Sequence, residues 1–96
     1  MTNKILTLHP EGKKGVNIDL GKYNLIKQTI LDILRTHGEI QYRELNKMVI
    51  EDLQHKFSGS IPWYVVTVKL DLEARGIIER IPNTSPHVVR ISSTAI

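Results

Sequence analysis

One segment constrains the architecture of this 96-residue chain more than any other: Leu70-Asp71-Leu72-Glu73-Ala74-Arg75-Gly76-Ile77-Ile78-Glu79-Arg80. Leu72 continues an apolar series at helical spacing, formed with Ile61, Val65 and Val68. Gly76 can adopt the left-handed conformation that commonly ends a helix. The apolar residues that follow this glycine are typical of a strand. The segment therefore predicts a helix that ends at Gly76 and a strand over residues 77–81.

The sequence on either side of this segment extends the prediction. Ser60 is a favourable N-cap for the helix, and it is expected to accept a hydrogen bond from the Trp63 N–H because Pro62 has no N–H to donate. Downstream, Pro82-Asn83-Thr84-Ser85-Pro86 has the composition of a turn. Residues 87–91 then read as the returning strand. A helix followed by a β-hairpin is predicted.

Two more helices are expected upstream, over residues 20–36 and 42–57. The first has an apolar stripe, a cap at Asp19 and a stop at Gly38. The second has an apolar stripe but a poor N-cap, since neither Gln41 nor Tyr42 is a favoured capping residue. Between them, residues 39–41 allow at most a strand of bridge length. The predicted stripes consist of Ile26, Ile30, Ile33 and Leu34 in the first helix, and of Leu45, Met48, Val49 and Leu53 in the second.

The N-terminal part is predicted to form an extension with short strands at residues 5–8 and 16–20, joined by the loop His9-Pro10-Glu11-Gly12-Lys13-Lys14-Gly15. Val16 and Ile18 are expected to pack on the helices. The resulting organisation is an extension over residues 1–19, one domain over 20–91 and a frayed tail over 92–96. The fold class is α+β: three helices in a helix-turn-helix arrangement, a C-terminal β-hairpin wing and a short N-terminal β extension.

Residues 70–80 resemble the junction between recognition helix and wing in bacterial winged-helix regulators. A closer similarity is to a group of short bacterial proteins of the winged-helix superfamily with no assigned activity. It is carried by His9-Pro10-Glu11-Gly12-Lys13-Lys14-Gly15-Val16, Tyr23, Trp63-Tyr64-Val65 and residues 70–80. The superfamily resemblance implies DNA binding, with the third helix in the major groove and the wing on the flanking backbone.

Charge and composition restrict the classes of function. Thirteen basic and ten acidic residues give a formal net charge of +3, which permits an anionic partner without requiring one. The chain has no cysteine, which excludes disulfides and cysteine-ligated zinc. No apolar run approaches the ~18–20 residues of a membrane span, and no signal peptide precedes the first strand. We expect a cytoplasmic protein without membrane contact.

The sequence contains no pattern that is typical of catalysis. No two of the four histidines are spaced like ligands of one metal ion, and no nucleophile motif is present. We therefore expect no enzymatic activity, no cofactor and no metal.

The candidate contact residues are those that a winged-helix protein would turn toward a partner: Lys13, Lys14, Ser60, Trp63, Tyr64, Thr67, Lys69, Arg80 and Arg90. Thr67, Lys69 and Asp71 are expected on the exposed side of the third helix. Trp63 is expected to point outward, where it would either pack against residues 5–8 or contact a partner. One hypothesis is a small transcription regulator that binds double-stranded DNA. The alternative, favoured by the neutral third helix, is a module for protein contact or homodimerisation without DNA binding. A continuous basic stripe would favour DNA, and scattered charge around an exposed Trp63 would favour protein contact.

Overall fold

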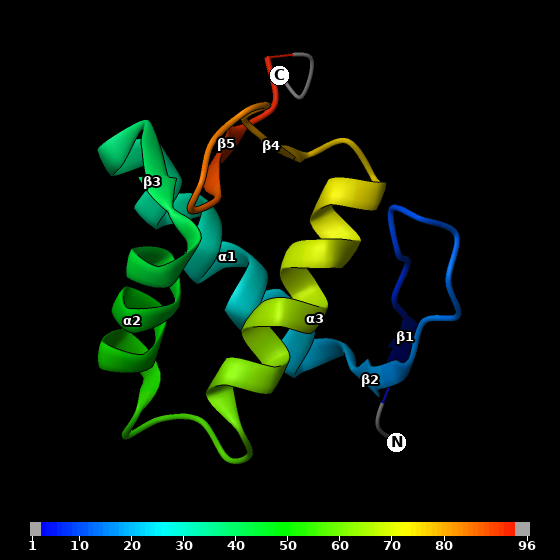
Figure 1. Cartoon of the computed structure of the whole chain (residues 1–96). Helices are drawn as coiled ribbons and strands as arrows, with labels where there is room; N and C mark the ends of the chain where they lie inside the picture. Colours follow the sequence, from blue (N-terminus) through cyan, green and yellow to red (C-terminus); the bar gives the residue numbers. More distant parts are fainter. Residues whose placement is uncertain (1–2, 94–96) are drawn as a thin grey trace.

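The computed structural model describes residues 3–93 and has three helices and two small antiparallel sheets, which confirms the α+β class (Figure 1). In chain order the elements are β1 (Lys4–Leu6), β2 (Asn17–Asp19), α1 (Leu20–His37), β3 (Glu39–Gln41), α2 (Tyr42–Leu53), α3 (Ile61–Ala74), β4 (Ile78–Arg80) and β5 (Val88–Ile91). Within the described residues, none of these helices is both long and apolar enough to cross a membrane.

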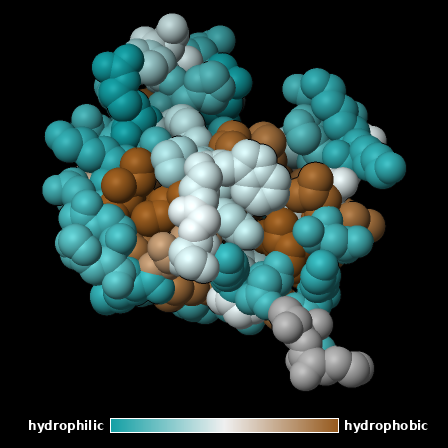
Figure 2. All heavy atoms as spheres, turned by 90° about the horizontal axis from the view of Figure 1, so that it is seen from below, coloured by the Kyte–Doolittle hydropathy of each residue, from teal (hydrophilic) through white to brown (hydrophobic). Residues whose placement is uncertain are grey.

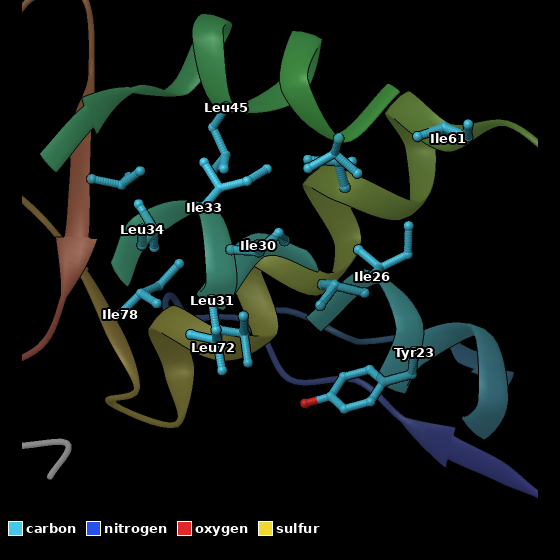
Figure 3. Packing of buried hydrophobic residues seen from close by; sticks show 14 of the residues in the cluster. Tyr23, Ile26, Ile30, Leu31, Ile33, Leu34, Leu45, Ile61, Leu72 and Ile78 are labelled. Atoms are coloured by element: carbon cyan, nitrogen blue, oxygen red, sulfur yellow. The ribbon is translucent and has the colours of Figure 1, made fainter. Parts of the chain in front are cut away.

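The three helices pack against one another around a single hydrophobic core (Figure 3). Each predicted stripe faces that core, although Met48 is only partly buried. Ile78 of β4 and Val89 of β5 cover one end of it. The residues with almost no exposed surface include Ile26, Ile30, Leu34, Leu45, Val49, Val65, Val68 and Leu72.

Local hydrogen bonds explain where the helices begin. The Asp19 carboxylate accepts from the Lys22 N–H at 2.9 Å, and the Ser60 hydroxyl accepts from the Trp63 N–H at 3.4 Å. Both caps are the predicted ones. Gln41 makes no side-chain cap to α2, as expected for this residue type.

The end of α3 explains why β4 begins at Ile78 and not at Ile77. Gly76 has φ +73°, its N–H donates to the Glu73 carbonyl, and the Ile77 N–H donates to the Leu72 carbonyl. This is the hydrogen-bond pattern of a Schellman motif. Ile77 is therefore part of the helix cap, and the buried strand residue is Ile78.

The larger sheet has the order β3–β5–β4, so the last strand of the chain lies between the other two. Ile40 pairs with Val89, and Arg80 pairs with Val89 from the other side. The predicted short strand before α2 is thus a full partner in this sheet. The sheet joins the segment between α1 and α2 to the hairpin that follows α3.

The smaller sheet, β1–β2, forms with its connecting loop an N-terminal arm, residues 4–19. It lies beside α3 on the side away from α2 (Figure 1). Ile5 pairs with Ile18, and Ile18 is buried as predicted. The prediction for Val16 was wrong: its side chain is 40% exposed, because it precedes the paired part of β2 and lies at the loop.

Several segment bounds differ from the prediction, and β1, for instance, ends at Leu6 and not at residue 8. The helix α2 stops at Leu53, four residues before the expected end, and the chain then runs through a turn to Gly59, whose φ is +115°. The predicted frayed tail starts at Ser92, yet this residue is buried and its N–H donates to the Ile77 carbonyl at 2.9 Å. Residues 94–96 of that tail lie outside the described residues.

Truncation of Leu72 tests the packing of α3 on the core. Leu72 has no exposed surface, so Leu72→Ala should lower the free energy of unfolding by about 2–5 kcal/mol, measured by urea denaturation. Val66→Ala is the matched control on the same helix, because Val66 is 37% exposed, and it should cost less than about 1 kcal/mol. Equal losses for the two variants would contradict this packing.

Candidate interaction face of α3

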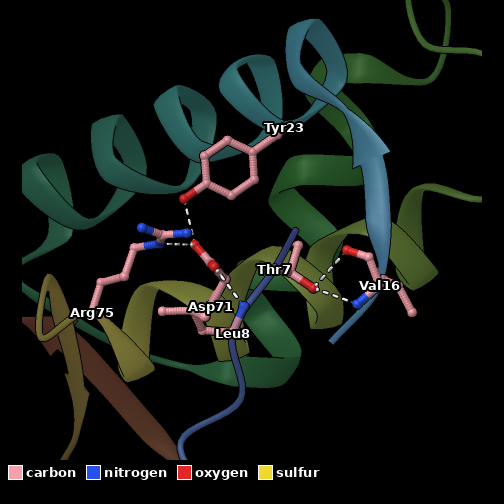
Figure 4. Close-up of polar contacts among 6 residues, drawn as sticks. All are labelled: Thr7, Leu8, Val16, Tyr23, Asp71 and Arg75. Atoms are coloured by element: carbon pink, nitrogen blue, oxygen red, sulfur yellow. Dashed lines mark hydrogen bonds and ion pairs between the residues drawn. The ribbon is translucent and has the colours of Figure 1, made fainter. Parts of the chain in front are cut away.

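The buried carboxylate of Asp71 joins α3 to two other parts of the chain (Figure 4). Its Oδ1 accepts from the Leu8 N–H at 2.8 Å, and its Oδ2 accepts from the Tyr23 hydroxyl and from Arg75 Nε, the latter at 2.8 Å. Asp71 is 0% exposed. The expectation that it lies on the exposed side of the helix was wrong, because three donors satisfy the carboxylate inside the protein.

The arm closes on itself directly beside this carboxylate. The Thr7 hydroxyl donates to the Val16 carbonyl at 3.1 Å and accepts from the Val16 N–H at 3.0 Å. The backbone comes so close here that a Cβ on Gly15 would stand 1.7 Å from the Thr7 carbonyl oxygen. Glycine is therefore required at position 15 by close approach and not by an unusual φ. These contacts fix the shape of the loop that passes along α3.

Lys69 is also withdrawn from the surface, which corrects the prediction that it is exposed. Its side chain is 8% exposed, its Nζ lies 3.3 Å from a Glu73 carboxylate oxygen, and the same Nζ lies 5.1 Å from the centre of the Tyr42 ring. The ring and the carboxylate hold the ammonium group against the helix. Burial and then the Glu73 charge raise the pKa of Tyr42.

The outward side of α3 is consequently apolar. Its residues recur at positions i, i+3, i+4, i+7 and i+11: Trp63, Val66, Thr67, Leu70 and Ala74. Within this stripe, the polar side-chain groups are the Thr67 hydroxyl and the indole N–H of Trp63. Trp63 is 44% exposed, in agreement with the predicted outward direction. We call this stripe, together with Leu8 and Val16 of the arm, the α3 face.

Trp63 is held in place from beneath while its outer surface stays open. Its ring contacts the Tyr64 ring edge to face at 5.0 Å between centroids, and Tyr64 contacts Phe57 in the same way at 4.9 Å. Lys22 Nζ lies 5.4 Å from the centroid of the Phe57 ring and 5.4 Å from that of the Tyr64 ring. Such contacts favour one orientation of the indole. Figure 2, which views the molecule from the N-terminal end of α3, shows several exposed hydrophobic patches on this side.

A cavity of about 160 Å³ opens between the arm and α3, and it lies within the α3 face. Lys14 is the one Lys, Arg, Asp or Glu residue among the described residues that line it. The lining also includes Leu8, Val16, Trp63, Thr67 and Leu70. No carboxylate of the described residues lines it. The cavity thus combines apolar walls with a single cation.

The remaining predicted cations do not form a free basic stripe. Lys13 pairs with Glu11 at 3.2 Å, and Arg90 pairs with Glu79 at 2.7 Å. Lys13, Lys69 and Arg80 do line one groove, between the arm and the β4–β5 hairpin, but Lys69 is neutralised by Glu73. Among residues 3–93, Lys14 and Arg80 are the members of the predicted set without an ion pair. Ser60 serves as the helix cap, and Tyr64 is half-buried between aromatic rings.

Several residues of this region escaped the sequence prediction. Leu8, Val66, Leu70 and Ala74 of the α3 face were not predicted as contact residues, Val16 was expected to pack on the helices, and the histidines were expected to have no functional role. The signal for Val66, Leu70 and Ala74 was present, because α3 is apolar around most of its circumference, which is typical of a helix with two covered faces. The alternative that Trp63 packs against residues 5–8 is met in part, because Leu8 and Trp63 line the same cavity while Trp63 stays 44% exposed. In the part of the chain that the structure describes, no group of three or more His, Cys, Asp or Glu residues could hold a metal ion.

The sequence matches the model of DUF6958, a family of unknown function, over residues 4–89. The match covers the arm, the three helices and most of the β4–β5 hairpin. No curated protein and no solved structure is significantly similar to the chain.

The Tyr23–Asp71 contact predicts a loss of stability at high pH. Burial, followed by the hydrogen bond and charge of Asp71, raises the pKa of Tyr23 well above its ordinary value. Above pH ~10 the unfolded chain loses the tyrosine proton while the native chain keeps it, so stability falls by about 1.4 kcal/mol per pH unit from this group. Below pH ~10 the contribution is fully present.

Urea unfolding at several pH values between about 9 and 11 measures this slope. Tyr23→Phe should remove the part of this pH-dependent loss of stability that comes from Tyr23. The pKa of Tyr42 is raised in the same direction, so Tyr42→Phe should also reduce the slope, and the two substitutions together should reduce it further than either alone. An unchanged slope in Tyr23→Phe would show that Tyr23 does not titrate in this way.

Proposed function

The chain belongs to DUF6958, a family of unknown function, and we propose a function from the geometry of its surface. We propose that the protein is a winged-helix domain that binds a protein segment on its α3 face. The winged-helix assignment is supported by the order α1, β3, α2, α3, β4, β5 and by the sheet order β3–β5–β4. In this assignment α3 corresponds to the recognition helix and the β4–β5 hairpin to the wing.

The chemistry of the outward side of α3 is the observation that carries the proposal. Helices that read DNA present Arg, Lys, Asn or Gln to base edges. Here Lys69 and Asp71 are buried and paired, and the outward stripe offers one hydroxyl, that of Thr67. Exposed aromatic and aliphatic groups in this position are typical of a protein interface, where Trp often contributes most of the binding energy.

The lining of the small cavity identifies the kind of segment that would bind. Its volume of about 160 Å³ is close to that of an engineered apolar cavity that takes benzene, so it fits one apolar side chain. Lys14, without an ion pair and without a neighbouring carboxylate in the lining, favours an acidic residue beside that side chain. A second copy of this chain would place Lys14 near its own equivalent in a symmetric contact. We therefore propose a partner segment with an apolar anchor next to a carboxylate.

A pair of small probes tests this site without knowledge of the partner. N-acetyl-leucine carries both an isobutyl group and a carboxylate, whereas N-acetyl-leucinamide lacks the charge. Both should shift the amide resonances of Trp63, Thr67 and Val16 in ¹H–¹⁵N spectra, and the acid should bind more tightly. Trp63→Ala should weaken binding of both probes about tenfold or more, and Lys14→Gln should abolish the preference for the acid.

Leu25→Ala is the matched control, because Leu25 of α1 is an apolar residue of similar exposure that does not line the cavity. It should leave binding of both probes unchanged. Shifts distributed over Leu25 and other exposed apolar residues would mean that no specific site exists. Concentration-dependent sedimentation that Trp63→Ala abolishes would instead identify a second copy as the occupant.

DNA binding is the second candidate, and one observation favours it. Arg80 has no ion pair among the described residues and stands on β4, at the edge of the groove beside the wing. Lys14 and Lys13 on the arm flank the same side of α3. In this alternative the wing and the arm would contact the phosphate backbone, and α3 would contribute little to sequence reading.

The salt dependence of affinity for mixed-sequence duplex DNA distinguishes this alternative. With Lys14 and Arg80 as phosphate contacts, log affinity should fall with log salt with a slope of about −2, and Arg80→Gln should reduce the slope by about one. Trp63→Ala should leave the slope unchanged. If fluorescence anisotropy at ~50 mM salt detects no binding at tens of micromolar protein, DNA binding is excluded as the function.

A further inference from the structure

A second cavity lies toward the C-terminal end of α3 and shares His9 and Leu70 with the cavity beside Trp63. It is a groove of about 490 Å³ between the loop of the arm, the C-terminal half of α3 and the β4–β5 hairpin. Its volume is within the range of small-molecule sites. The lining mixes apolar residues with ionisable ones, among them His9, Lys13, Lys69, Glu73, Arg80 and His87. Three segments that are distant in the sequence thus bring ionisable side chains to one place.

The groove lining holds equal numbers of cations and carboxylates, but Arg90, the ion-pair partner of Glu79, is not part of that lining. Three carboxylates, those of Glu11, Glu73 and Glu79, also line it, but each lies within an ion pair, with Lys13, Lys69 and Arg90 respectively. Arg80 has no such partner among residues 3–93. The guanidinium group is therefore available for an anion from outside the chain.

The two histidines of the groove are suited to donate hydrogen bonds to the same anion. His9 Nδ1 accepts from the Glu11 N–H at 3.1 Å, so the proton of the neutral ring is on Nε2. At His87, burial and then the charges of Arg80 and Lys69 lower the pKa, while Glu73 acts in the opposite direction. The electrostatic potential at the His87 ring is thus positive, because the charges of Arg80 and Lys69 outweigh that of Glu73.

We propose that this groove binds the phosphate group of a small molecule, with Arg80 as the principal contact and the imidazoles of His9 and His87 as further donors. Phosphate suits the groove better than carboxylate because its tetrahedral oxygens can accept from donors on several sides. Here the donors come from the arm, from β4 and from the residue just before β5. The rest of the groove accommodates the remainder of the ligand. This site does not depend on the proposed protein contact of the α3 face.

Inorganic phosphate is the probe, compared with sodium chloride at matched ionic strength and neutral pH. ¹H–¹⁵N spectra should show saturable shifts at Arg80 and His87, with the side-chain resonances of both groove histidines following the same curve. Bound phosphate favours the imidazolium form, so the pKa of His87 should rise toward its ordinary value. Arg80→Gln should weaken phosphate binding about tenfold, and Arg80→Lys should restore part of it.

Arg43→Gln is the matched control, since Arg43 is an exposed arginine of α2 outside the groove, and it should bind phosphate as the natural chain does. Shifts that do not saturate, or that spread over exposed lysines and Arg43, would overturn the proposal. A duplex-DNA titration separates the two sources of phosphate. If Arg80 responds to duplex DNA but not to inorganic phosphate, the groove is a contact for the nucleic-acid backbone and the small-molecule site is excluded.

Discussion

The carboxylate of Asp71 is the group on which the arrangement of the rest of the molecule depends. A fully buried carboxylate without partners would cost several kcal/mol, and it is tolerated here because Tyr23, Arg75 and the Leu8 N–H all donate to it. Each of these donors comes from a different part of the chain. Satisfying one charge therefore requires that α1, α3 and the arm take up one definite arrangement.

This arrangement determines what α3 presents to the surroundings. Asp71 faces inward to its three donors, and Lys69 is drawn to Glu73 and the Tyr42 ring, so the helix has little charge left for solvent. Its outward stripe is apolar from Trp63 to Ala74. An exposed tryptophan supported by an edge-to-face stack with Tyr64 and Phe57 is pre-ordered for contact, which reduces the entropic cost of binding.

The arm separates two sites of different chemistry along the same helix. The cavity beside Trp63 is apolar with one lysine, and the groove beside Arg80 is polar with two histidines. His9 and Leu70 line both of them. The loop of the arm thus forms a wall of each site, and its position depends on the Leu8–Asp71 hydrogen bond and on the closure between Thr7 and Val16.

Helix positions, caps and core stripes could be predicted from the sequence because the interactions that set them are local. Asp19, Ser60 and Gly76 act within four residues of their own positions, and apolar periodicity alone placed Leu72 in the core. The burial of Lys69 and Asp71 could not be predicted from the sequence. A charged side chain on a helix can either face solvent or pair with a buried partner, and local sequence does not distinguish the two. The partners Leu8 and Tyr23 lie 63 and 48 residues away from Asp71, and only the packing of the arm and α1 against α3 brings them within hydrogen-bonding distance.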